Sequence, residues 1–152
     1  MKKIFVVFLL IFLVSCAKNI NQISIDNGKK IIKINVEIAD DSEKRMQGLM
    51  FREKLDESKG MFFIFDNEDY LTFWMENTLI PLDIIFIDKD FKIVDIKYAV
   101  PCKSDQCRLY KPSRLAKYVL EVNGNFSINN KISVGNKVIL LCVKTNTPYL
   151  IK

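Results

Sequence analysis

The residues best suited to chemistry lie in one apolar run, the stretch 73–88 with the sequence FWMENTLIPLDIIFID. Polar side chains interrupt this run at Asn77, Thr78 and Asp83. An ionised carboxylate in such a strand needs partners, or it takes up a proton. Two roles are therefore open. The three side chains brace the turn between two core strands through backbone hydrogen bonds, or they line a binding site.

Two arginines in a predicted helix could complete such a site. Arg45 and Arg52 are seven residues apart, so on an α-helix they share one face to within about 20°. A pair of guanidinium groups beside amide, hydroxyl and indole groups suits an anionic or sugar-like ligand. The predicted ligand-binding residues are Arg45, Arg52, Trp74, Asn77, Thr78 and Asp83.

A carboxylate-based hydrolase is the enzymatic alternative. Asp83 and Glu121 both lie in apolar, strand-like segments, and a glycoside hydrolase needs two carboxyl groups that face one cleft. Glu121 also fits the solvent-facing position of an alternating strand, or the ion-pair partner of an arginine. The chain contains no histidine, which excludes Ser-His and Cys-His dyads and histidine-based zinc sites. We therefore favour a non-enzymatic role and assign no catalytic residue.

Methionine offers one further kind of site. Met46, Met50, Met61 and Met75 lie near Trp74 in the sequence, and thioethers together with an indole face can bind Cu(I). Methionine at such spacings is far more often core filler. We expect no metal site and no cofactor.

The hydrophobic pattern predicts the elements that must position these residues. Alternation of apolar and polar residues on either side of a turn predicts a hairpin over 23–40, and apolar spacing after two aspartates predicts a helix over 42–51. Further strands are predicted at 60–65, 70–75, 82–88, 91–98, 114–122 and 137–144. We expect a mainly β (α+β) fold. It is a compact single-domain β-barrel or sandwich of about seven or eight short strands with one short N-terminal helix.

The first residues predict an export signal. A basic start precedes the apolar run 4–14, which is too short for a membrane-spanning helix of ~20 residues. The run ends in Leu13-Val14-Ser15-Cys16, which resembles the lipobox of bacterial lipoproteins. By that resemblance, Cys16 becomes the lipidated N-terminus. The expected organisation is a signal peptide at 1–15, a lipidated N-terminus and tether at 16–28, a domain at 29–144 and a tail at 145–152.

Two further cysteines are consistent with an extracytoplasmic location. Cys102 and Cys107 lie in a loop-like segment between two prolines. A short loop in an oxidising compartment is a suitable place for a disulfide bond. The alternative is a C-x4-C metal or redox pair, but the chain has no histidine to complete a metal site.

A family resemblance covers most of the predicted domain. The segments RMQGLMFREKL, GMFFIF, FWMENTLIPLDIIFID, YVLEVNG and ISVGNKV follow one another in this order. In this respect the chain resembles the uncharacterised DUF192 (UPF0127) family over roughly residues 31–143. The resemblance implies a small, mainly β domain with a helix near its start and no established activity. Glu76 and Asn136 stand where relatives often have Lys and Asp, so a ligand that either position served would be recognised differently.

These observations together give the expected function. The chain should be lipid-anchored in the cell membrane or outer membrane and should face the extracytoplasmic space. Its expected work is non-enzymatic binding of a small anionic or carbohydrate-like envelope ligand. A protein–protein interaction or structural envelope module is the main alternative. The net charge of +5 is too modest to argue for a nucleic-acid partner.

Overall fold

The computed structural model describes residues 20–103 and 106–142. The predicted signal peptide, the lipidation site Cys16 and the tail at 145–152 lie outside the described residues. Within the predicted tether at 16–28, Ile20–Asp26 instead form a strand that pairs with two others in the sheet. Within the described ranges, no helix has both the length and the apolar character needed to cross a membrane.

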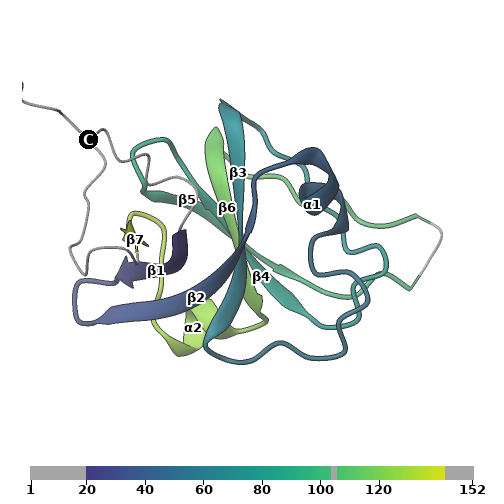
Figure 1. Cartoon of the computed structure of the whole chain (residues 1–152), viewed down its shortest axis with the longest axis horizontal. Coiled ribbons are helices and arrows are strands. Elements are labelled where there is room, and N and C mark those ends of the chain that lie inside the picture. Colours follow the sequence, from purple (N-terminus) through teal and green to yellow (C-terminus); the bar gives the residue numbers. More distant parts are fainter. Residues whose placement is uncertain (1–19, 104–105, 143–152) are drawn as a thin grey trace, which may run out of the picture.

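Seven strands form one strongly curled sheet (Figure 1). They are β1 (Ile20–Asp26), β2 (Ile31–Ala39), β3 (Lys59–Asp69), β4 (Leu82–Ile87), β5 (Ile93–Ala99), β6 (Ala116–Asn123) and β7 (Lys137–Cys142). Their order across the sheet is β5-β4-β6-β3-β2-β1-β7. Strands β2 and β3 pair in parallel, and the other neighbours pair antiparallel. The predicted mainly β, single-domain fold and the hairpin of β1 and β2 are confirmed.

The two edge strands meet at one end of the sheet. Lys92, just before β5, forms an isolated bridge with Lys137 of β7. The Ile93 N–H donates to the Asn136 carbonyl at 3.0 Å, and the Gly135 N–H donates to the Ile93 carbonyl at 2.8 Å. The sheet therefore approaches a closed barrel, and its two edges shield each other at that end.

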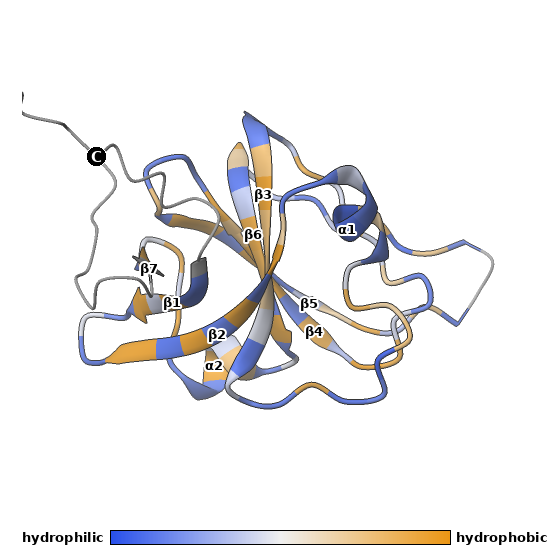
Figure 2. Cartoon of the chain, in the orientation of Figure 1, coloured by the Kyte–Doolittle hydropathy of each residue, from blue (hydrophilic) through white to orange (hydrophobic). Residues whose placement is uncertain are grey.

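Strand β6 lies inside the sheet and faces two hydrophobic clusters. Successive residues of a strand point to opposite faces. Leu120 and Val122 therefore join a barrel-side cluster, which takes residues from all seven strands, while Val119 joins a loop-side cluster on the other face. The loop-side cluster also contains Leu49, Leu71, Met75 and Tyr110 from outside the sheet. Figure 2 shows this alternation as bands of opposite hydropathy along the strands.

The first helix is shorter than predicted. Helix α1 spans Ser42–Gln47, whereas the apolar spacing predicted a helix to residue 51. Asp41 caps its start and accepts the Lys44 N–H at 2.8 Å. Gly48 ends it at a φ of 50°, a positive value that favours glycine. The residues after Gly48 continue as a turn. The prediction of a helix up to residue 51 is therefore wrong.

The predicted strand over 70–75 is a loop in the structure. Within this loop, Phe73 pairs in an isolated bridge with Tyr110. Its N–H donates to the Tyr110 carbonyl at 3.0 Å, and its carbonyl accepts the Tyr110 N–H at 2.8 Å. The apolar character of the segment has another cause, because Leu71 and Met75 are buried in the loop-side cluster.

Asp83 of β4 holds the start of a short helix that follows β6. Its carboxylate accepts the backbone N–H of Asn125 at 3.0 Å and that of Ser127 at 2.7 Å. These donors belong to the start of α2 (Phe126–Asn129), a short helix that the prediction lacks. The Asn125 side chain makes no capping hydrogen bond, so Asp83 satisfies this helix end from a neighbouring strand.

The substitution Asp83→Asn should lower the free energy of unfolding by roughly 1–3 kcal/mol. Asparagine offers one acceptor oxygen, so one buried N–H loses its partner. Urea unfolding measures the change. The exposed Asp66, which lies in β3, provides the matched control as Asp66→Asn and should have no measurable effect. Equal effects of the two substitutions would contradict the bracing role.

Candidate functional site

Three segments meet at one end of the molecule and form the candidate site. They are α1, the loop between β3 and β4, and the loop between β5 and β6 (Figure 1). Backbone hydrogen bonds join them: the Phe51 N–H donates to the Asn77 carbonyl at 2.8 Å, and the Cys102 N–H donates to the Met75 carbonyl at 3.3 Å. Two hollows open between these segments, and Trp74 lines both.

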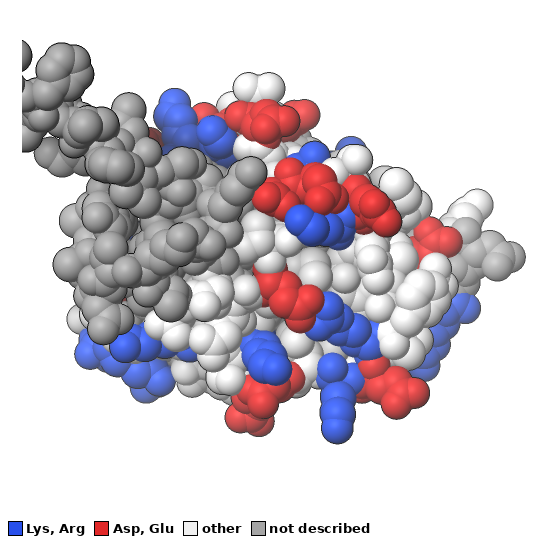
Figure 3. All heavy atoms as spheres, viewed as in Figure 1, with Lys and Arg blue, Asp and Glu red and all other residues white. Residues whose placement is uncertain are grey.

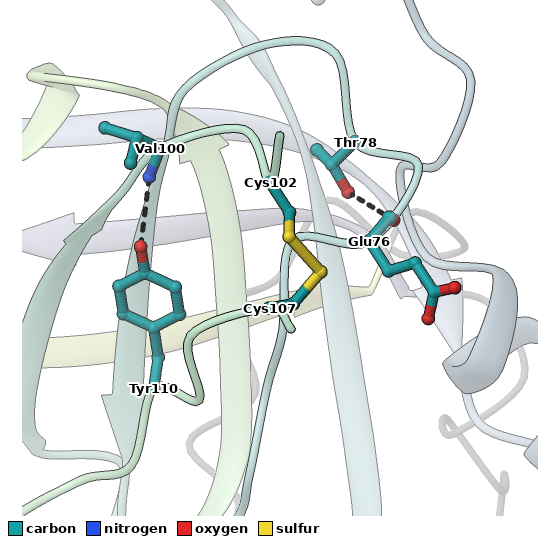
Figure 4. The surroundings of a disulfide bond; sticks show 6 residues. All are labelled: Glu76, Thr78, Val100, Cys102, Cys107 and Tyr110. Carbon is teal, nitrogen blue, oxygen red and sulfur yellow. Dashed lines mark hydrogen bonds between the residues drawn. A yellow bond between two sulfur atoms is a disulfide. The ribbon is translucent and has the colours of Figure 1, made fainter. Parts of the chain in front are cut away.

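The predicted disulfide bond between Cys102 and Cys107 is confirmed. Figure 4 shows it between Glu76 and Tyr110. The Tyr110 hydroxyl accepts the Val100 N–H at 3.2 Å. This hydrogen bond joins the two ends of the loop that carries the disulfide bond. The bond closes a loop of few residues, so it restrains one wall of the site.

The larger hollow is broad and open to solvent. Its volume is about 760 Å³, and its lining residues are Trp74, Glu76, Asn77, Cys102, Lys103, Gln106, Cys107 and Leu109. Trp74 remains 47% exposed. The hollow thus offers an accessible indole surrounded by amide, carboxylate and ammonium groups, which can donate and accept hydrogen bonds.

The smaller pocket lies beside it, under the end of α1. Its volume is about 30 Å³, which is enough for one small group. The lining residues are Arg45, Met46, Gln47, Gly48, Leu49, Met50, Phe63, Phe73, Trp74, Thr78 and Glu121. Most of these groups are apolar or aromatic, so a charged group in the pocket is poorly solvated.

Glu121 is the acidic group of this pocket. Its side chain is 4% exposed, and burial raises the pKa of its carboxyl group from 4.5 to about 8. No hydrogen bond or ion pair from the described residues reaches this carboxyl group. The solvent-facing and ion-paired interpretations of Glu121 are therefore wrong. At pH 7 the group is mainly protonated, because it has lost water without gaining a partner.

The structure brings together only part of the predicted ligand-binding set. Trp74 and Asn77 line the larger hollow, and Arg45, Trp74 and Thr78 line the smaller pocket. Arg52 and Asp83 line neither of them. The Thr78 hydroxyl donates to the Glu76 carbonyl at 3.3 Å (Figure 4), so it also supports the local turn.

The two arginines do not form the predicted pair. Arg52 lies beyond the end of α1 and makes a two-pronged ion pair with Glu37, with two N···O distances of 2.6 Å. This hydrogen bonding lowers the pKa of Glu37 and raises that of Arg52. Arg45 donates to the carbonyls of Asp40 and Ile64 and lies over the Phe65 ring. Acidic and basic side chains are mixed on this face (Figure 3).

Asp83 and Glu121 point to opposite faces of the sheet. Glu121 of β6 pairs with Ile84 of β4, and Asp83 pairs with Val122. Since paired residues share a face and successive residues alternate, the two carboxyl groups cannot face one cleft. The expectation of a hydrolase that uses both residues is therefore wrong.

The methionines also divide between core and pocket. Met61 and Met75 are buried in the loop-side cluster, where they serve as core residues. Met46 and Met50 line the smaller pocket beside Trp74. Two of the four thioethers therefore belong to the core, and the other two line the pocket.

Sequence reasoning missed the pocket itself. Glu121 is flanked by Val119, Leu120 and Val122, which indicates a strand buried on both faces rather than one alternating with solvent. That signal could have identified the carboxyl group as buried. The place of Gly48 in the pocket lining could not have been predicted, because it depends on where α1 ends.

Comparison with known proteins places the chain in a family. The family model DUF192, described as "Uncharacterized ACR", matches residues 23–140. A UPF0127 protein of Pyrococcus abyssi is 33% identical over 105 residues, which cover 68% of this chain and 83% of that protein.

Two crystal structures share the fold. A protein of unknown function from Novosphingobium aromaticivorans is 34% identical with a TM-score of 0.73, and the match covers 78% of this chain and 84% of that one. A suggested transcription regulator from Sinorhizobium meliloti is 30% identical with a TM-score of 0.73, over 78% of this chain and 92% of that one. The chain belongs to the DUF192 (UPF0127) family.

Proposed function

We infer that this chain is a lipid-anchored, extracytoplasmic binding protein that holds a carbohydrate-like ligand over Trp74. The observation that carries this proposal is the position of the indole, which is half-exposed and lines both hollows. A sugar ring has an apolar C–H face and a rim of hydroxyl groups. It therefore suits an aromatic side chain surrounded by groups that donate and accept hydrogen bonds.

The arginines decide between the two expected ligand classes. An anionic ligand would need free guanidinium groups in the site. Arg52 is paired with Glu37, and Arg45 directs its Nη1 at two backbone carbonyls. Of the residues that line the larger hollow, Lys103 brings a positive charge and Glu76 a negative one, so their charges offset each other. A neutral, polyhydroxylated ligand fits this lining better than an anion.

Two features support the proposed extracytoplasmic location. The first is the N-terminal pattern of a basic start, a short apolar run and Cys16 in a lipobox-like sequence. The second is the disulfide bond between Cys102 and Cys107, a bond that persists in oxidising compartments and is rare in the cytosol. An anchor of two or three acyl chains would hold the domain firmly at a membrane.

A protein–protein interaction module in the envelope is the second candidate. It is favoured by large apolar side chains that remain exposed on or next to the loops of the site. These are Leu79, Tyr98, Val100 and Leu109. A protein partner would cover this surface without needing the pocket beneath Trp74.

Trp74 is the single tryptophan of the chain, so intrinsic fluorescence can report on the site directly. Titration with chitin, cellulose and cell-wall oligosaccharides should change the emission of the indole with at least one of them. The substitution Trp74→Ala should weaken binding of that ligand by about 1–2 kcal/mol, measured by calorimetry.

Tyr70 provides the control for this experiment. It is also exposed and lines a separate hollow, so Tyr70→Ala should leave the affinity unchanged. If no oligosaccharide changes the emission, while the exposed apolar residues are needed to retain an envelope protein, the interaction module is favoured instead.

Lipid attachment has its own test. The full chain expressed in a bacterium should incorporate labelled palmitate and sediment with membranes, because the predicted lipid-bearing residue is Cys16. The substitution Cys16→Ser should abolish both the label and the membrane association. A Cys16→Ser chain that still carries label would refute the predicted anchor.

A further inference from the structure

We propose that the smaller pocket binds a positively charged amine of the ligand, with Glu121 as the opposite charge. This inference rests on the carbohydrate-binding function proposed above and narrows the ligand to an amino sugar. The sugar ring would lie against Trp74 in the larger hollow, and its ammonium group would enter the smaller pocket, which shares Trp74 as a wall.

The first support is the state of the Glu121 carboxyl group. It is almost fully buried, it lines the pocket, and it has no partner among the described residues. A buried carboxyl group is stabilised by a hydrogen-bond donor, and most strongly by a charged one. An ammonium group supplies both the donors and the opposite charge.

The second support is the access that Gly48 leaves. A Cβ atom at this position would stand 3.9 Å from Oε2 of Glu121 and 3.6 Å from Cζ of Phe63. Any side chain here would therefore lie against the carboxyl group. Because residue 48 is glycine, the end of α1 leaves this space open.

The third support is the chemistry of the walls. Phe63, Phe73 and Trp74 contribute aromatic rings, and Met46 and Met50 contribute polarisable thioethers. Aromatic faces attract ammonium groups through their negative quadrupole. The volume of about 30 Å³ admits one group of this size and excludes the sugar ring itself.

Among the residues that the structure describes, no neighbouring cation already fills this role. Arg45 from α1 is the other charged residue of the pocket lining, and its guanidinium group donates to the carbonyls of Asp40 and Ile64. Strand β3 contributes Phe63, and the loop before β4 contributes Phe73, Trp74 and Thr78, which carry no charge. The raised pKa of Glu121 comes from burial, with no contribution from a nearby charge.

Binding would therefore release a proton. The protonated carboxyl group of Glu121 loses its proton to solvent, and the resulting carboxylate pairs with the ammonium group, which keeps its own protons. With a pKa of about 8, the carboxyl group is about tenfold more often protonated than ionised at pH 7. The affinity for an amine is lowered by about the same factor at that pH.

Three matched trisaccharides test the proposal on the full chain, purified in detergent. Chitosan trisaccharide carries an amine at C2, chitin trisaccharide an acetamide and cellotriose a hydroxyl group. Calorimetry at pH 6, where the C2 amine is mainly an ammonium group and the Glu121 carboxyl group is still protonated, should show the amine sugar binding about tenfold more tightly than cellotriose. Its enthalpy should also depend on the ionisation enthalpy of the buffer, because a proton is released.

Two carboxamide substitutions test whether the preference for the amine and the proton release depend on Glu121. Glu121→Gln should remove both the preference for the amine and the proton release, while binding of cellotriose persists. Glu57→Gln changes an exposed carboxylate that lines neither hollow and should keep both. The three sugars compared on the unaltered chain test the preference even if Glu121→Gln does not fold.

Two other results would overturn the inference. Equal affinity for the three sugars, without proton release, would remove the amine site but leave the carbohydrate-binding function in place. No binding of any of the three, with unchanged Trp74 emission, would overturn the inference together with the proposed function on which it rests.

Discussion

Strand β6 is buried on both faces over residues 119–122, and this burial dictates how the sheet and the loops pack around it. Its neighbours are β3 and β4, so it lies in the middle of the sheet, between the barrel-side and loop-side clusters. Each side chain over residues 119–122, the continuously buried part of β6, must therefore be apolar, find a partner, or remain unsatisfied. Leu120 and Val122 meet the first condition. Glu121 is neither apolar nor paired within the described residues, and it lies at the pocket.

The loops that complete the site are irregular in conformation but firmly held. Phe73 and Tyr110 exchange two backbone hydrogen bonds, and the Asn77 carbonyl accepts a bond from the turn after α1. The disulfide bond between Cys102 and Cys107 closes the facing loop. The sheet supplies the buried carboxyl group, and the loops supply Trp74 and the polar rim. This division is typical of binding sites built on rigid scaffolds.

Much of the fold could be predicted from the sequence, because strand alternation and turn residues are local signals. The hairpin and the mainly β architecture are examples, and the disulfide bond was predicted from two cysteines that lie close together in a loop-like segment. The site was harder to predict because it depends on tertiary detail. Gly48 ends α1 early, so Arg45 and Arg52 do not lie on one helix. Their seven-residue spacing therefore does not place them on a common face. The face on which Glu121 lies depends on register with β4, which local pattern does not determine.

The titration of Glu121 shows whether this carboxyl group is buried in the pocket without an opposite charge. Carbon-13 NMR of glutamate carboxyl carbons can follow it, with Glu121→Gln assigning the signal. The structure predicts a midpoint at about pH 8, raised by burial. A midpoint near the ordinary 4.5 would show a solvated or ion-paired carboxylate and would contradict the account of the pocket.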